Sequence, residues 1–124
     1  MTDIIKMPLK EKFFSVEEYY STLFHEMAHS TGHECRLNRK TLLEANSQGS
    51  GVYSKEELVA EITSAFLCAE AGIQNQVFEN QAAYISNWAS KLKDKPSMII
   101  EASQKAQKAF DYITNNSNPM EAKQ

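Results

Sequence analysis

Apolar residues recur every three or four positions along most of this 124-residue chain, which is the spacing of amphipathic helices. The first such stretch opens with a capping box, in which Ser15 caps the helix and Glu18 lies three residues further on. Gly32 is placed to end this helix. Between these limits the helix is predicted to run through Tyr19, Tyr20, Leu23, Phe24, Met27 and Ala28.

Three further helices are predicted from similar patterns. A second capping box spans residues 54–57, and Gly72 is placed to close the helix that follows it. Asn80 is the predicted cap of a third helix, and Pro96 lies in the first turn of a fourth. Their apolar positions are Leu58, Ile62, Ala65, Phe66 and Ala69, then Tyr84, Ile85, Trp88 and Leu92, then Ile99, Ile100, Ala106, Phe110 and Ile113.

The remaining segments are short. Residues 3–8 are β-branched and stopped by a proline, which predicts an edge strand or an extended arm. Residues 46–51 are rich in turn formers and predict a loop. The sequence therefore predicts one α+β, mostly helical domain over residues 1–114, with a small N-terminal β element and a flexible C-terminal tail over residues 115–124.

The first predicted helix contains the H-E-x-x-H string His25-Glu26-Met27-Ala28-His29. Residues four apart on a helix share a face, so both imidazoles can reach one metal ion. Glu26 lies beside the first histidine, where it can act on a bound water as a general base. The alternative is a helix whose histidines only pack or form surface hydrogen bonds. The paired spacing with an acid between favours a Zn²⁺ site over that alternative.

A catalytic zinc site needs a third protein ligand. We favour Glu61, because a carboxylate at the border of a buried helical stripe is costly unless a charged partner such as zinc lies beside it. Glu57 is the second choice, and the glutamate that does not bind could orient a ligand histidine. The alternative for both is a solvated surface, with Glu57 only completing the capping box.

Two residues that follow Gly32 are alternative third ligands. His33 is four residues beyond His29, but the glycine should break the helix between them. Cys35 occupies the position where metzincins carry a third histidine, and no Met-turn is evident. Cys35 and Cys68 are better interpreted as small apolar residues, because two cysteines make no disulfide framework.

Composition narrows the function classes. The chain is 42% hydrophobic and 23% charged, as expected of a folded soluble protein, and no apolar run approaches the length of a membrane span. Its net charge of -3 argues against a general nucleic-acid binder, although Arg36, Arg39 and Lys40, or the lysines at 91, 93, 95, 105 and 108, are basic enough to be considered. A reduced, cytoplasmic setting is expected.

The residues around the string resemble the zincin-like metallopeptidase domain of ArdC-type antirestriction proteins, a domain also found in plasmid primase-like and mobile-element polyproteins. The resemblance is carried by residues 19–33 and 36–39, by 53–62 and 65–68, and by 80–85 and 106–113. It implies a zincin-like fold in which the helix bearing the string packs on a glutamate-bearing helix. It also implies zinc-dependent peptide-bond hydrolysis, for which the expected ligands are His25, His29 and, by the burial argument above, Glu61.

In that mechanism Glu26 is the general base for the attack of water on a protein or peptide substrate, whose identity the sequence does not indicate. Tyr53 or another tyrosine could stabilise the oxyanion, with core packing as the alternative role. The rival function is a catalytically silent, zinc-stabilised interaction module that acts in antirestriction. ArdC-type proteins carry a single-stranded-DNA-binding domain ahead of this region; we expect it to be absent here, so DNA binding is not carried over.

Overall fold

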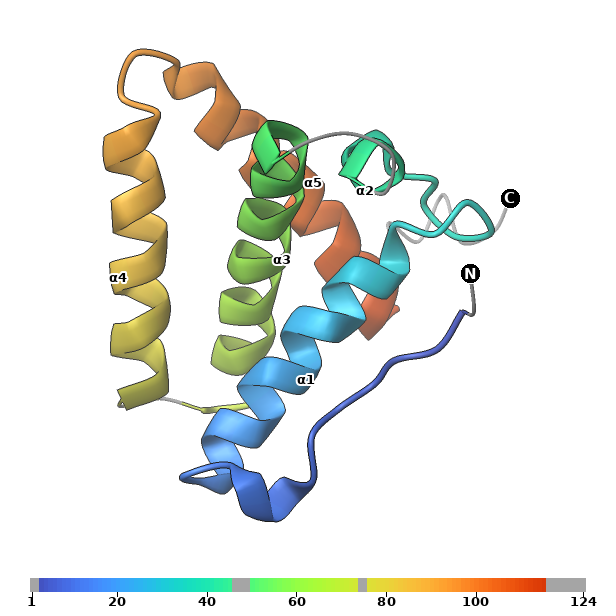
Figure 1. The fold of residues 1–124 in the computed structure, drawn as a ribbon, viewed down its shortest axis with the longest axis vertical. Coiled ribbons are helices and arrows are strands. Elements are labelled where there is room, and N and C mark those ends of the chain that lie inside the picture. Colours follow the sequence, from blue (N-terminus) through green and yellow to red (C-terminus); the bar gives the residue numbers. More distant parts are fainter. Residues whose placement is uncertain (1–2, 46–49, 74–75, 116–124) are drawn as a thin grey trace.

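Five α-helices and one short 3-10 helix make up the described part of the computed structural model, which comprises residues 3–45, 50–73 and 76–115 (Figure 1). The side chains of residues 50–54 and 76–78 lie outside the description. In chain order the elements are η1 (Lys10–Lys12), α1 (Val16–Thr31), α2 (Lys40–Ala45), α3 (Ser50–Glu70), α4 (Gln76–Lys91) and α5 (Pro96–Thr114). None of these helices is both long and apolar enough to cross a bilayer.

The predicted N-terminal β element is wrong. Over the described residues no strand forms, and residues 3–9 run as an extended arm alongside α1 (Figure 1). A strand needs a second strand to satisfy its backbone groups, and the described chain offers none. The arm is instead tied down by Asp3, whose two carboxylate oxygens accept hydrogen bonds from the Arg36 guanidinium at 3.1 and 2.5 Å.

The limits of α1 are those that the sequence predicts. The Ser15 hydroxyl accepts a hydrogen bond from the backbone N–H of Glu18 at 3.1 Å, so the predicted N-cap is confirmed. Gly32 caps the other end, with a right-handed φ of -79°. Its small size matters because an added Cβ would lie 2.8 Å from Arg39 Nη2. The glycine is therefore required by close packing rather than by a left-handed backbone.

Two of the later helices, α3 and α4, begin earlier than predicted. α3 starts at Ser50, so Ser54 lies inside the helix and residues 50 and 51 of the predicted loop are helical. α4 starts at Gln76, four residues before Asn80. Internal polar residues mimic caps when sequence alone is considered, because the same side chains can cap a helix or face solvent within it. Gly72 does end α3, with a φ of 76°, and Pro96 does open α5.

The core is built around α3, which packs against the other four helices. Leu58, Val59 and Ile62 of α3 are nearly fully buried against Ala102 and Ala106 of α5. The small alanines let the two helices approach closely, while larger side chains close the rim: Phe66, Ile85, Trp88, Leu92 and Ile99. This packing fixes the rotation of α3, and so decides which of its glutamates faces α1.

Candidate metal centre

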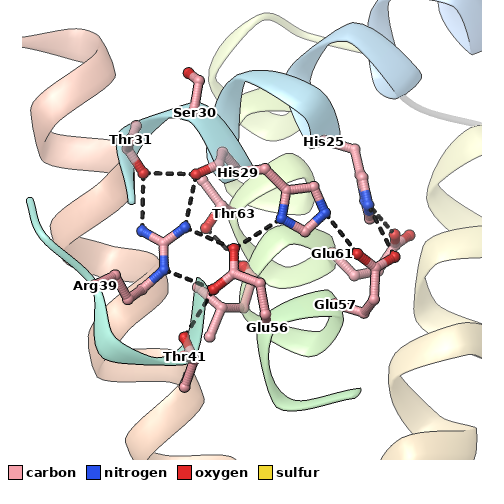
Figure 2. A network of polar contacts seen from close by, with 12 residues as sticks. His25, His29, Ser30, Thr31, Arg39, Thr41, Glu56, Glu57, Glu61 and Thr63 are labelled. Carbon is pink, nitrogen blue, oxygen red and sulfur yellow. Dashed lines mark hydrogen bonds and ion pairs between the residues drawn. The ribbon is translucent and has the colours of Figure 1, made fainter. Parts of the chain in front are cut away.

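Two histidines of α1 meet a row of glutamates on α3 (Figure 2). His25 and His29 are one helical turn apart, and their ring centroids lie 4.8 Å from each other. Both side chains are largely buried, at 18% and 19% exposure. The predicted pairing of the string-bearing helix with a glutamate-bearing helix is therefore seen in the structure.

Each histidine contacts two carboxylates through its two ring nitrogens. The Nδ1 of His25 lies 3.0 Å from Glu61 Oε2, and its Nε2 lies 3.3 Å from Glu57 Oε1. The Nδ1 of His29 lies 2.7 Å from Glu56 Oε2, and its Nε2 lies 2.6 Å from Glu57 Oε2. Both Nε2 atoms therefore converge on Glu57, while the Nδ1 atoms are held from behind by Glu61 and Glu56.

This arrangement bears on the choice of the third ligand. His25, His29 and Glu57 each offer a ligand atom, and these atoms lie within 4.8 Å of one another. Glu61, which the sequence favoured, faces the opposite nitrogen of His25. A carboxylate on the second nitrogen is the usual support of a metal-bound histidine, because it fixes the tautomer and the ring orientation. The geometry thus fits Glu57 as ligand and Glu61 as support.

The site concentrates charge. Burial of His25 opposes its protonation, but the carboxylates of Glu57 and Glu61 outweigh it and raise the pKa of the ring to about 10. Burial of His29 is likewise outweighed by Glu56 and Glu57, which raise its pKa to about 9. Burial favours neutral Glu57, yet the two rings lower its pKa to about 2. One divalent cation could replace the two ring protons without changing the net charge of the site. The donor set therefore fits such an ion.

Glu56 belongs to a sealed network behind His29 (Figure 2). Its side chain is 1% exposed, and the Arg39 guanidinium donates to both of its oxygens at 2.9 and 2.8 Å. The Thr41 hydroxyl donates to Oε1 at 2.7 Å. Burial raises the pKa of Glu56, but these donors and His29 lower it overall. A buried charge with this many partners is well satisfied and rigidly placed.

Arg39 reaches this position through the turn that follows α1. Asn38 adopts a left-handed φ of 50°, which turns the chain back so that the next side chain enters the interior. There Arg39 also donates to the Thr31 hydroxyl and the Ala28 carbonyl, each at 2.9 Å. From the sequence, Arg39 was only a candidate cation for nucleic-acid binding, and Glu56 had no role of its own. A glutamate next to Glu57 and a turn between Gly32 and Arg39 were the available signals.

The turn also separates the two alternative ligands from the centre. The Nδ1 of His33 accepts a hydrogen bond from the backbone N–H of Cys35 at 3.1 Å, and Cys35 is exposed. Neither residue belongs to the group of possible metal ligands found in the described chain. As expected, Gly32 ends α1 before His33 can share the face of His29.

The remaining predicted site residues are the general base Glu26 and the tyrosines considered as oxyanion donors. Glu26 is half-buried on α1, and in the described chain its carboxylate has no hydrogen bond or ion pair, so it is available to a water or substrate. The side chain of Tyr53 lies outside the described residues. The pKa of Tyr84 on α4 is raised, mainly by burial. A hydrogen bond with Trp88 lowers this pKa, and the nearby charges of Glu57 and Glu61 raise it.

Comparison with known proteins agrees with a metal centre of the zincin type. A family model described as a zincin-like metallopeptidase matches residues 1–105. The chain belongs to this family. The DNA primase TraC of Escherichia coli is 40% identical over 112 residues, a match that covers 90% of this chain and 8% of the primase. The uncharacterized protein y4eC of Sinorhizobium fredii is 32% identical over 112 residues, covering 90% of this chain and 36% of that protein.

Solved structures of the antirestriction protein ArdC from plasmid R388 share the fold. The Mn(II)-bound structure is 40% identical with a TM-score of 0.68, and the match covers 89% of this chain and 40% of that one. The metal-free structure is 41% identical with a TM-score of 0.67, covering 92% of this chain and 40% of that one. The resemblance stated from the sequence is confirmed. This family member spans less than half the length of these relatives.

Proposed function

We propose that this chain is a zinc-dependent metallopeptidase domain that hydrolyses peptide bonds. His25, His29 and Glu57 are the proposed ligands, and Glu26 is the proposed general base. The observation that carries the proposal is the convergence of both Nε2 atoms on the Glu57 carboxylate, while each Nδ1 is held by a separate glutamate. The Mn(II)-bound state of the antirestriction relative supports the binding of a divalent ion.

When bound, zinc would supply a Lewis acid that polarises the scissile carbonyl and lowers the pKa of water to about 7. Glu26 accepts the proton of the attacking water at its carboxylate and delivers it to the leaving amine. With the ion bound, Glu61 and Glu56 would accept hydrogen bonds from the Nδ1–H groups of His25 and His29, and each Nε2 would be free to hold the ion. Tyr84, which lines the same cleft as Glu61, is the proposed hydrogen-bond donor to the developing oxyanion.

Cleavage of a peptide mixture by the zinc-loaded chain tests this function. Wild type is expected to release new N-termini, and Glu26→Gln is expected to bind zinc fully but cleave at least about a hundred times more slowly, because general-base catalysis supplies that much. Glu17→Gln changes a glutamate at the start of the same helix and serves as the control. Equal cleavage by wild type and Glu26→Gln would refute the proposed chemistry.

A second candidate is a catalytically silent module that acts through binding in antirestriction. Its support is the 40% identity with a protein that is named for antirestriction, ArdC of plasmid R388. The assay is protection of incoming plasmid DNA in cells that carry a restriction enzyme. Protection that survives Glu26→Gln but is lost in His25→Ala would favour the module, whereas loss in both variants would favour hydrolysis.

A further inference from the structure

A cleft of about 710 Å³ opens beside the metal centre. One wall is the start of α1 with the residues before it, the other is α4, and Glu61 of α3 lies in its lining. Because Glu61 Oε2 lies 3.0 Å from the Nδ1 of His25, the cleft begins directly behind a proposed metal ligand. Its volume is that of a typical ligand site.

The cleft is acidic. Glu18 and Glu61 are the charged residues of its lining, and neither lysine nor arginine lines it in the described chain. Glu61 forms an ion pair with His25, but Glu18 forms no ion pair within the described chain. Its backbone N–H bonds Ser15, whereas its carboxylate does not close the capping box and has no partner among the described residues. A half-buried carboxylate without a counter-ion favours a cationic occupant.

Two further side chains of the lining favour the same occupant. Phe14 is 98% exposed, and a free aromatic face attracts a cation placed over it. Gln81 is 3% exposed; its amide nitrogen bonds Ser21 and Ser64, but its Oε1 has no hydrogen-bond partner. Gln81 lines the cleft, so a turn of its amide would bring this unpaired acceptor to an occupant that carries hydrogen-bond donors. An ammonium or guanidinium group carries both the charge and the donors.

We infer that this cleft is a substrate subsite that receives a lysine or arginine side chain of the peptide, with Glu18 as its counter-ion and Phe14 as its cation–π partner. The inference rests on the proposed function, because the cleft is assigned to the substrate of that same centre. It adds a substrate class to the proposed reaction: peptides that carry a basic residue.

Binding tests the subsite without requiring turnover. Zinc-loaded Glu26→Gln protein is titrated into fluorescent decapeptide pools with an alanine and glycine background, in which arginine occupies each position in turn. Matched pools carry citrulline, which keeps the shape but lacks the charge. Arginine pools are expected to bind about tenfold more tightly at the preferred positions. Equal binding of arginine and citrulline pools at every position would overturn the subsite.

Glu18→Gln supplies the decisive variant and Glu17→Gln its control. Both glutamates lie in the first turn of α1, so both substitutions remove the same charge from the helix N-terminus, but Glu17 does not line the cleft. Glu18→Gln is expected to abolish the preference for arginine, and Glu17→Gln to retain it. Loss of the preference in both variants would show that general charge attraction, and not the subsite, selects the peptide.

Cleavage of the same pools separates the subsite from the reaction. If wild type cuts them with no enrichment of lysine or arginine near the cut, the subsite fails while the peptidase stands. If nothing is cut but the arginine preference depends on Glu18, the peptidase fails and the cleft stands as a binding site for basic peptides. A Phe14→Ala variant should weaken the preference without removing it, because the ion pair with Glu18 remains.

Discussion

The two histidines of the centre are supported in opposite ways. His29 is held by Glu56, which is 1% exposed and locked by Arg39 and Thr41 in the interior. His25 is held by Glu61, which is 17% exposed and lines the open cleft. One proposed ligand is therefore held from the core of the domain, while the other is held from the lining of the cleft. In the proposed function, the His29 side sets the geometry and the His25 side meets the substrate.

The largest effect is expected on the sealed side. Arg39→Ala would leave the buried Glu56 carboxylate without its cation, which typically costs about 3–5 kcal/mol. Urea denaturation of the metal-free protein measures this loss. The matched control is Arg36→Ala, three residues away in the same turn, which removes a surface ion pair with Asp3 and one hydrogen bond to the Ser30 carbonyl and should cost much less. A similar small loss in both variants would show that the network does not stabilise the fold.

The next comparison separates the roles of the two glutamates that face His25. Glu57→Ala removes a proposed ligand, so zinc is expected to be lost on desalting. Glu61→Ala removes only the support of the His25 ring, and the affinity for zinc is expected to fall about 10–100-fold while the ion is retained at saturating concentration. Elemental mass spectrometry and competition with a chelator measure both. Retention of zinc in Glu57→Ala with its loss in Glu61→Ala would restore Glu61 as the third ligand.

Sequence could not decide between these glutamates for a physical reason. The argument from burial expected the ligand to lie nearer the buried stripe, but Glu57 and Glu61 are almost equally exposed, at 18% and 17%. What distinguishes them is which histidine nitrogen each one meets. That depends on the rotation of α3 against α1, which long-range packing sets and a helical pattern alone does not reveal.

The sequence predicted correctly those features that depend only on residues close together along the chain. The Ser15 cap, the end of α1 at Gly32 and the shared face of His25 and His29 depend on residues within two turns of one another. The failures involve distant partners. A β element over residues 3–8 needed a second strand, and the buried role of Arg39 needed a carboxylate seventeen positions away in Glu56.

A smaller effect is expected at the glycine that admits Arg39 to the interior. Gly32→Ala would place a Cβ 2.8 Å from Arg39 Nη2 and 2.9 Å from Leu42 Cδ2, and overpacking of this kind costs about 1–3 kcal/mol. Since Arg39 carries the support of His29, affinity for zinc should fall as well. Gly72→Ala is the control: it strains a positive φ but lies in open space just beyond the end of α3, so it should lower stability and leave zinc affinity unchanged. Unchanged zinc affinity in Gly32→Ala would uncouple the turn from the metal centre.

The smallest expected effect is a coupling of zinc uptake to pH. In the metal-free protein the pKa values of His25 and His29 are raised to about 10 and about 9, so both rings are protonated at neutral pH. Zinc must displace these protons, so its affinity should rise with pH until the rings titrate, and about two protons should leave per ion near pH 7. Glu57, with its pKa lowered to about 2, is already ionised and releases none. Calorimetry in two buffers of different ionisation enthalpy counts the protons.

Glu61→Gln removes one carboxylate that raises the pKa of His25, so this variant should release fewer protons at alkaline pH. Release of less than one proton by wild type at neutral pH would contradict the pairing of the rings with α3.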